Sequence, residues 1–285
     1  MTDHTAIAFD ALVGGGVLRR ELDRGGRMLR WVEAGSGTPV VLEAGAMSPV
    51  AGFAAVFKGL VPDCRVIAYD RAGYGMSDPS PLSLDLQVGD LIAVLEQVGP
   101  AVVVGHSWGG LLAQLATWDR PDLVSGLVLL DPSHERYWQD DEPMEHPDRT
   151  RPAKDDPRCQ EILDFGQELA QDVNRSVGAD LTAACRSYLE TDEQLFTYLD
   201  ELPMIIDHVA DLVARRADAI WPAIPVVLLT ATKGRAPEWT PLVLDVQNKL
   251  ATECNGRHQV VPESGHYLQI DVPDLVIACV REVMP

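Results

Sequence analysis

The stretch VVVGHSWGGLL at residues 102–112 decides the fold that we expect for this chain. An apolar run of strand length meets Gly-x-Ser-x-Gly, and apolar residues at helical spacing follow it as far as Ala116. This order predicts a strand, a sharp turn and a helix. Gly105 and Gly109 let the backbone pass Ser107 in a strained conformation, which would lift the Ser107 Oγ above the sheet beside the helix N-terminus. The alternative is a glycine-rich turn that only closes a strand-helix unit.

The composition describes a chain that can bury a full core and carries a strong negative charge. Apolar residues make up 46% of the sequence, and 43 acidic against 23 basic residues give a formal net charge of −20. This charge disfavours nucleic acid, anionic membranes and highly anionic substrates as partners. The first residues carry no basic segment, and no run of about eighteen apolar residues occurs, so we expect no signal peptide, no membrane span and a cytoplasmic protein.

The cysteines and the acidic stretch do not indicate a metal or cofactor site. Five scattered cysteines without Cys-x-x-Cys spacing favour reduced thiols, and a bridge between Cys159 and Cys185 is the alternative. The acidic stretch from His134 to His146 lacks the spacing that fixes zinc geometry, so we interpret it as a solvated loop. The glycine-rich turn at 70–77 lacks a Gly-Lys-Ser/Thr ending and is interpreted as structural. We expect neither a metal nor a cofactor.

Apolar runs alternate with helical patterns and predict a mostly parallel α/β sheet flanked by helices. Two short runs joined by the residues 23–26 predict a β-hairpin. Residues 1–16 end in three glycines, and we interpret them as a loosely attached arm. Further buried strands are expected at 39–42, 65–69, 102–104, 125–131, 225–229 and 258–261.

With the Gly-x-Ser-x-Gly turn and a Ser-Gly-His that follows the last strand, the sequence resembles the α/β-hydrolase family. The resemblance covers nearly the whole chain except the segment after Asp131. It implies that Ser107 is the nucleophile and that His266 is the catalytic base. A histidine satisfied in a loop is the alternative reading of His266.

The resemblance also implies an oxyanion hole, which needs two backbone N–H groups aimed at the tetrahedral oxyanion. Those of Ala46 and Trp108 are expected to supply it. The loop departs from the family at Ala44, where relatives commonly have a histidine. Glu43, which ends the preceding strand, is interpreted as hydrogen-bonding the loop backbone, with a role in the site as the alternative.

The third member of the triad has two candidate positions. Many family members carry an aspartate just after the penultimate strand, but no carboxylate lies near that strand end here. Asp131 ends the strand after the nucleophile helix, at the edge of the sheet where ligands bind, and a subset of the family uses this position. We therefore favour Asp131, and Glu238 is the alternative acid.

The chain changes character after Asp131, where prolines and acids precede a series of helical patterns. This segment resembles the helical cap of many relatives. We expect an α/β-hydrolase core at 1–131 and 222–285 and a helical cap insertion at 132–221. Helical patterns within the cap lie at 161–172, 179–190, 194–202 and 204–220.

These residues predict acyl transfer on a small, largely apolar substrate. Ester or lactone hydrolysis through a Ser-His-Asp triad and an acyl-enzyme is the favoured reaction, without a cofactor. Thioester, amide or carbon–carbon bond hydrolysis on the same residues is an alternative, as is a small-ligand sensor on the same fold. We expect a monomer or a homodimer that takes only a small-molecule substrate as its partner.

Overall fold

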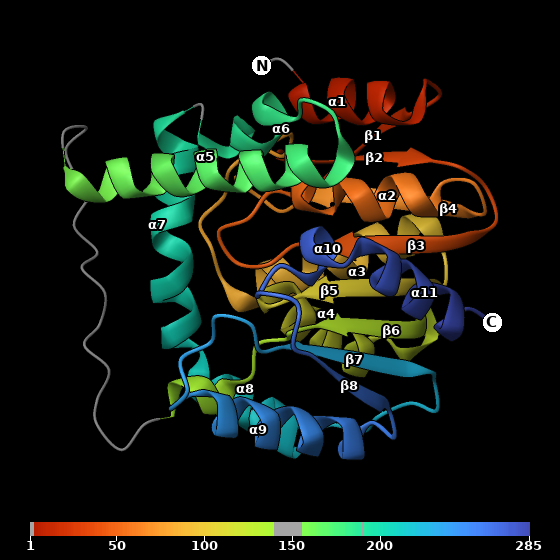
Figure 1. The fold of residues 1–285 in the computed structure, drawn as a ribbon, viewed down its shortest axis with the longest axis vertical. Helices are drawn as coiled ribbons and strands as arrows, with labels where there is room; N and C mark the ends of the chain where they lie inside the picture. The colour runs from red at the N-terminus through yellow and green to blue at the C-terminus, as the bar shows by residue number, and fades with distance from the viewer. Residues whose placement is uncertain (1–2, 140–155, 190) are drawn as a thin grey trace.

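The computed structural model describes residues 3–139, 156–189 and 191–285, and one eight-stranded sheet forms its centre. The strand order is β1-β2-β4-β3-β5-β6-β7-β8, which Figure 1 shows from top to bottom. Strands β3 to β8 pair in parallel, whereas β2 pairs antiparallel with both β1 and β4. The expected hairpin and mostly parallel sheet are therefore confirmed. The strands are β1 Leu18–Asp23, β2 Met28–Ala34, β3 Thr38–Glu43, β4 Cys64–Asp70, β5 Ala101–His106, β6 Val124–Leu130, β7 Val226–Ala231 and β8 Arg257–Val261.

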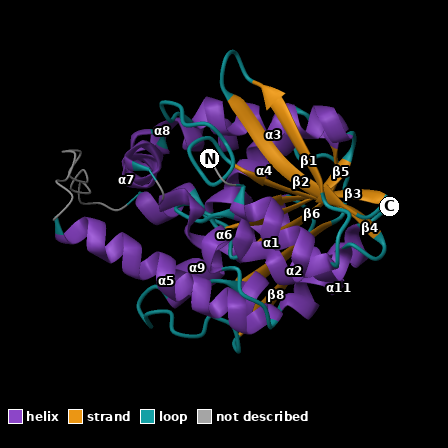
Figure 2. Ribbon diagram, turned by 90° about the horizontal axis from the view of Figure 1, so that it is seen from above, coloured by secondary structure: helices purple, strands orange, loops and turns teal. Residues whose placement is uncertain are grey.

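The inner strands read as continuous apolar runs because helices cover both faces of the sheet. Alternate side chains of a strand point to opposite faces. In β5, Val102 and Val104 belong to one hydrophobic cluster and Val103 to the other. Helices α2 (Ala54–Leu60) and α11 (Pro273–Val283) pack into the first cluster, and α3 (Leu84–Val98) and α4 (Trp108–Asp119) into the second. Figure 2 shows the sheet between these layers.

The expectation of a loose N-terminal arm is wrong, because residues 4–13 form the helix α1 (His4–Val13). The Asp3 carboxylate accepts the Ala6 N–H at the start of the helix. Gly14 ends the helix in the left-handed conformation, with φ of 80°. The Phe9 ring is fully buried and meets Phe57 edge to face at 4.7 Å. The glycine run is thus a helix stop.

The described residues between β6 and β7, where the sequence predicts a cap, are mainly helical. Figure 1 shows α7 standing at one end of the sheet, with α5 crossing its upper part and α8 below it. Helix α7 runs through Pro203, where two separate helices were expected, because Met204 and Ile205 continue into the hydrophobic core. The division into core and cap stays a prediction. The helices are α5 Pro157–Val177, α6 Thr182–Arg186, α7 Asp192–Asp207 and α8 Val209–Ala217, and later in the chain α9 Thr240–Glu253 and α10 Leu268–Asp271.

Several other expectations concern buried groups. No disulfide joins any of the cysteines, all of which lie within the described residues and are buried, so the alternative bridge between Cys159 and Cys185 is wrong. Most of the acidic stretch lies outside the described residues, but His134 and Glu135 are buried rather than solvated. Glu135 pairs at 2.6 Å with Arg216 of α8. In the described ranges we find no helix that is long and apolar enough to span a membrane.

Candidate active site

Ser107 occupies the sharp turn between β5 and α4. Its φ of 51° and ψ of −118° form a backbone conformation that L residues rarely adopt. A Cβ on Gly105 would lie 2.6 Å from the Gly109 carbonyl oxygen, and one on Gly109 would lie 2.3 Å from the Ala44 carbonyl oxygen. Only glycine therefore fits on either side of Ser107, which explains the Gly-x-Ser-x-Gly spacing.

The Ser107 side chain is half-buried and faces a second hydroxyl. Its Oγ lies 3.4 Å from the Ser133 Oγ, and the Ser133 N–H donates to the Ser107 carbonyl oxygen at 2.9 Å. Within the described ranges, no hydrogen bond joins the Ser107 Oγ to His266. The structure thus brings the candidate nucleophile to the correct turn without completing its contact with the candidate base.

The candidate base and the candidate acid are in direct contact. His266 Nδ1 lies 2.6 Å from the Oδ2 of Asp131, a nearly buried residue that follows β6 with a φ of 43°. The Asp131 N–H donates to the Leu229 carbonyl oxygen of β7 at 2.7 Å, which fixes the strained turn. Arg235 donates to the same Oδ2 at 2.5 Å. The alternative acid, Glu238, is exposed and makes no hydrogen bond to His266.

A second histidine, His106, contacts the loop that carries His266. The buried His106 ring lies beside the His266 ring, with centroids 4.6 Å apart, and its Nε2 is 2.9 Å from the His266 carbonyl oxygen. Because a carbonyl oxygen only accepts, Nε2 must carry the proton. Burial, with the neighbouring His266 adding to it, holds the pKa of His106 well below 6.5. His106 is therefore a neutral donor that fixes the backbone of His266.

The loop after β3 lies against the nucleophile. A Cβ on Gly45 would be 3.3 Å from the Ser107 Cβ, so the loop backbone approaches the turn closely. The N–H groups of Ala46 and Trp108 have no acceptor among the described residues. Two unpaired backbone donors next to a serine are what an oxyanion site requires. The assignment of these two donors stays a prediction.

Glu43 does not bind the loop backbone, which corrects the interpretation from the sequence. Its fully buried carboxylate accepts hydrogen bonds from the Tyr69 hydroxyl and, at 2.9 Å, from Arg71 Nη1. Arg71 contacts the loop in its place, and donates to the carbonyl oxygens of Ala44 at 2.5 Å and Gly45 at 2.7 Å. Burial raises the pKa of Glu43 to about 7, against the opposing effect of Arg71.

Glu201 of α7 is the second buried carboxylate at this loop. It accepts from Arg71 Nη2 at 3.0 Å, the Tyr74 hydroxyl at 2.6 Å, Gln87 Nε2 at 2.7 Å and the Met47 N–H at 2.6 Å. The sequence reasoning missed both Arg71 and Glu201. A signal for Glu201 exists, because it shares one face of α7 with the buried residues at 197 and 205.

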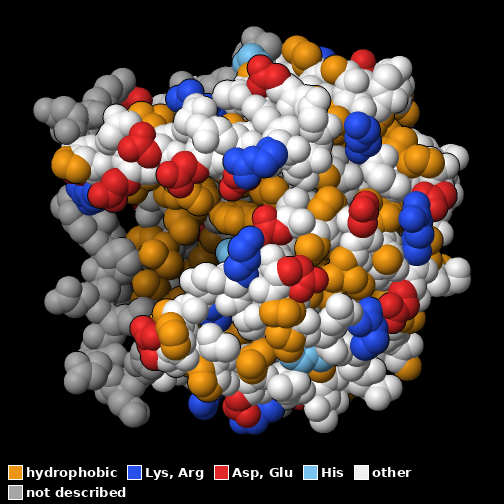
Figure 3. Space-filling model, in the orientation of Figure 1, with side chains coloured by type: hydrophobic (Ala, Val, Ile, Leu, Met, Phe, Trp, Pro, Cys, Tyr) orange, Lys and Arg blue, Asp and Glu red, His pale blue; other side chains and the backbone are white. Residues whose placement is uncertain are grey.

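An apolar cavity of about 350 Å³ opens beside this loop. Met47 joins it to the loop, and Phe165 of α5 joins it to Tyr267, the neighbour of His266, through ring centroids 6.4 Å apart. Figure 3 shows a hollow with hydrophobic side chains on this face of the molecule. The cavity is lined mainly by Met47, Ile162, Phe165, Tyr198, Leu199 and Leu202, with Arg158 and Glu161 also contributing.

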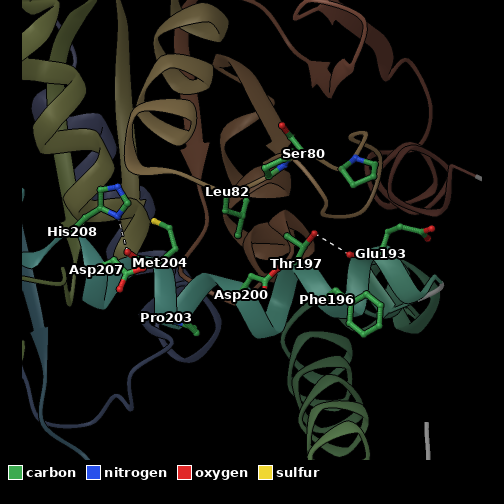
Figure 4. Close-up of a pocket in the computed structure, with 12 residues that line it drawn as sticks. Ser80, Leu82, Glu193, Phe196, Thr197, Asp200, Pro203, Met204, Asp207 and His208 are labelled. Carbon is green, nitrogen blue, oxygen red and sulfur yellow. Dashed lines mark hydrogen bonds between the residues drawn. The ribbon is translucent and has the colours of Figure 1, made fainter. Parts of the chain in front are cut away.

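A larger cavity of about 540 Å³ lies between residues 79–82 and α7. Figure 4 shows that its lining includes polar residues, with Thr197 donating to the Glu193 carbonyl oxygen and His208 bonded to that of Met204. No predicted catalytic residue lines it, and none lines the apolar cavity beside Met47, which differs in lying against the loop after β3. Size alone therefore does not identify the reactive site of this protein.

In the described part of the chain, no group of three or more His, Cys, Asp or Glu residues is arranged to hold a metal ion.

Comparisons with known proteins agree with this fold. The crystal structure of Cfl2 from Burkholderia cenocepacia superimposes with a TM-score of 0.73 over 94% of this chain and 96% of that one, at 20% identity. A probable esterase of Oryza sativa subsp. japonica is 26% identical over 250 residues, which are 78% of this chain and 83% of that protein.

Lipase LipV of Mycobacterium tuberculosis is 43% identical over 76 residues, which are 26% of this chain and 29% of the lipase. The chain thus matches less than a third of that relative's length. The model of the alpha/beta hydrolase family matches residues 35–278, which include the strands from β3 to β8 and the whole segment between β6 and β7. A match over this much of the chain shows the family: this protein belongs to the alpha/beta hydrolases.

Proposed function

We propose that this protein is a serine hydrolase that cleaves an ester or lactone bond of a small, largely apolar substrate. The observation that carries the proposal is the 2.6 Å contact of His266 Nδ1 with Asp131 at the sheet edge that also bears Ser107. An imidazole held by a carboxylate through Nδ1 presents Nε2 as a base. The separation of Ser107 from His266 fits a protein without substrate, because catalytic hydrogen bonds often tighten only in the substrate complex.

In the proposed reaction His266 Nε2 takes the proton of the Ser107 hydroxyl as its oxygen attacks the carbonyl carbon. The N–H groups of Ala46 and Trp108 stabilise the oxyanion, and the protonated His266 then donates its proton to the leaving alcohol. Water, deprotonated by His266, then attacks the acyl carbon, and the protonated His266 returns this proton to the Ser107 Oγ as the bond to the acyl group breaks and the acid leaves. Asp131 keeps the imidazole oriented and stabilises its positive charge.

The substrate class follows from the cavity beside Met47. Its wall is mainly aliphatic and aromatic, so it favours an apolar acyl or alcohol group over a charged one. The net charge of −20 disfavours polyanionic substrates as well. The relatives named as an esterase and a lipase support the reaction class. Because the nucleophile position holds serine, the chemistry of relatives that use an aspartate there is disfavoured.

A sensor on the same fold is the second candidate, and one observation favours it. The Ser107 hydroxyl lies 3.4 Å from the Ser133 hydroxyl, and among the described residues no hydrogen bond joins it to His266. A sensor would bind an apolar ligand in the cavity beside Met47 and turn it over slowly or not at all. Thermal stabilisation by the ligand without product formation would distinguish the sensor from the hydrolase.

Mass spectrometry after fluorophosphonate treatment tests the proposal. We expect one adduct on wild type, located on Ser107, and none on His266→Ala. Labelling of Asp131→Asn should be slower by several orders of magnitude, roughly 10⁴-fold in the comparable case. Glu238→Gln is the matched control and should label at the wild-type rate. Folded wild type that takes up no adduct would refute the activated serine, and slow labelling of Glu238→Gln with normal labelling of Asp131→Asn would move the acid to Glu238.

A further inference from the structure

Arg71 holds the carbonyl side of the peptide that carries a proposed oxyanion donor. Its Nη2 is 2.7 Å from the Gly45 carbonyl oxygen. The Gly45–Ala46 peptide is trans, so its C=O and N–H point in opposite directions. A hydrogen bond that draws the Gly45 oxygen toward Arg71 therefore turns the Ala46 N–H away from Arg71. That N–H has no protein acceptor among the described residues.

The next peptide is held from the other side of Ala46. The Met47 N–H donates to Glu201 Oε2 at 2.6 Å, and Met47 has a φ of 56°. Such a conformation persists in a non-glycine residue when its surroundings fix it. The two bonds, one to Arg71 and one to Glu201, fix the peptides on both sides of Ala46 and leave the loop little freedom to rotate.

Glu201 and Arg71 also bind each other, although 130 residues separate them. Arg71 is 3% exposed and Glu201 is fully buried, so neither side chain has water as an alternative partner. Arg71 is a loop residue after β4, and Glu201 lies on α7, in the segment expected as the cap. The ion pair thus links the conformation of the loop after β3 to the position of helix α7.

We propose that Arg71 is a positioning residue that sets the direction of the Ala46 N–H. Through its ion pair with Arg71, Glu201 makes this direction depend on whether helix α7 is packed against the loop. This inference rests on the proposed hydrolase function. When α7 is seated, Arg71 and the Met47 N–H have their carboxylate and the oxyanion donor is aligned. When α7 moves away, Arg71 loses one of its two carboxylates and the loop loses one of its two anchors.

The test compares Arg71→Lys with Arg27→Lys, using p-nitrophenyl butyrate as substrate and butylboronic acid as a tetrahedral ligand. Lysine keeps the charge but cannot bond two carbonyls and two carboxylates at once. Arg27 is the matched control, because it pairs at 2.5 Å with the buried carboxylate of Asp90 outside the site. We expect Arg71→Lys to lower kcat about 10- to 100-fold, since loss of a whole oxyanion donor costs roughly 10²–10³-fold.

The same variant should keep KM within about threefold of the wild-type value. Its affinity for butylboronic acid should fall in parallel with kcat, because both depend on stabilisation of a tetrahedral oxyanion. Arg27→Lys should keep wild-type kcat. An equal loss of kcat in both variants, or a change in KM alone, would overturn the positioning role. If Arg71→Lys does not fold, Glu201→Gln serves instead, and wild-type kcat in folded Glu201→Gln would overturn the coupling to α7.

The wild-type control separates this inference from the proposed function. Wild type that labels on Ser107 and hydrolyses the ester, while Arg71→Lys does so with the same kcat, refutes the inference alone. Wild type that neither labels nor hydrolyses refutes the hydrolase and the inference together. Parallel loss of kcat and boronate affinity in Arg71→Lys, with an unchanged Arg27→Lys, supports both.

Discussion

His106, the residue before the candidate nucleophile, does not belong to the triad, yet its ring fixes the loop of the candidate base. The hydrogen bond from its Nε2 to the His266 carbonyl oxygen joins two residues that are 160 positions apart in the sequence. Its Nδ1 is buried and has no partner among the described residues. A charged ring here would be desolvated, so the residue acts as a neutral donor at working pH.

Replacement of His106 by Phe should loosen the His266 loop without changing the acid limb of the pH profile. Phenylalanine keeps the ring volume and removes the donor, so we expect a loss of about 1 kcal/mol in the free energy of unfolding and a several-fold lower kcat. The pKa of His106 lies well below 6.5, so its removal should leave the acid limb of kcat/KM in place. A shifted acid limb, measured from pH 5 to 8, would show that His106 titrates during catalysis.

Glu43 predicts a pH-dependent stability that its amide analogue lacks. Burial raises its pKa from 4.5 to about 7 in the folded protein, so folding favours the protonated form. The stabilisation from this protonation is complete below pH 4.5 and is lost as the pH rises through about 7. We therefore expect the free energy of unfolding of wild type to fall relative to Glu43→Gln between pH 5 and 8. Urea unfolding at several pH values measures this, and parallel curves would contradict it.

Helix α7 has a capped N-terminus, an internal proline and a buried carboxylate. Thr191 and Gln194 form a capping box at its N-terminus. Pro203 removes one backbone donor near its other end, where Met204 and Ile205 pack into the core. The helix is thus held at its start by capping and in its last turns by burial.

The substitution Thr191→Ala should weaken the start of α7 and leave the active site unchanged. Loss of an N-cap typically costs about 1 kcal/mol. Glu201 lies more than two turns further along the helix, so its contact with Arg71 should persist. We expect faster amide hydrogen exchange over residues 192–196 and an unchanged kcat, with Thr191→Ser as the control that keeps the cap. Faster exchange that reached residue 201 would mean that the helix responds as one unit.

Local patterns made some elements predictable from the sequence. The turn at Ser107 needs glycines at fixed spacing, and the buried strands need continuous apolar runs, so both could be located without coordinates. The contact between His266 and Asp131 also followed from topology, because both residues lie at the carboxyl edge of the parallel sheet. For the turn and the strands the determining residues are close in sequence or repeat with a regular period, whereas His266 and Asp131 are 135 positions apart and meet because their strands end at the same edge.

Other features could not be predicted because their determinants lie far apart. The Arg71–Glu201 pair depends on how helix α7 packs against the loop after β4, and no periodicity encodes that. The same reason explains why Glu43 was assigned to the loop backbone, since the sequence does not indicate that Arg71 intervenes. Helix α1 was missed because its glycine stop resembles a flexible linker, while its buried apolar residues are only Ala6 and Phe9.

At the scale of the whole molecule, the reactivity of the thiols indicates whether the core is intact. All five cysteines are buried, in both the sheet and the helices. Burial raises the pKa of Cys185 to about 12 and that of Cys254 to about 11, so little thiolate forms near neutral pH. A thiolate is the reactive form of cysteine, and these positions are inert as long as the fold is intact.

The native protein should therefore react slowly with Ellman's reagent and release five equivalents once denatured. Five equivalents without added reductant would agree with the absence of a disulfide among the described residues. Rapid reaction of one thiol in the native protein would indicate local opening of the element that carries it. Three equivalents after denaturation would instead point to one bridge.

The buried carboxylate on α7 also bears on how this protein can be recombined. Inserted segments of related hydrolases are attractive parts for chimeras, because two chain crossings suffice to exchange them. Here the exchange of residues 132–221 would remove Glu201 and leave Arg71 with Glu43 as its only carboxylate partner within the described network. A transplanted segment would have to bring an acid to the same point, so residues 132–221 and the loop after β3 would have to be exchanged or redesigned as a pair.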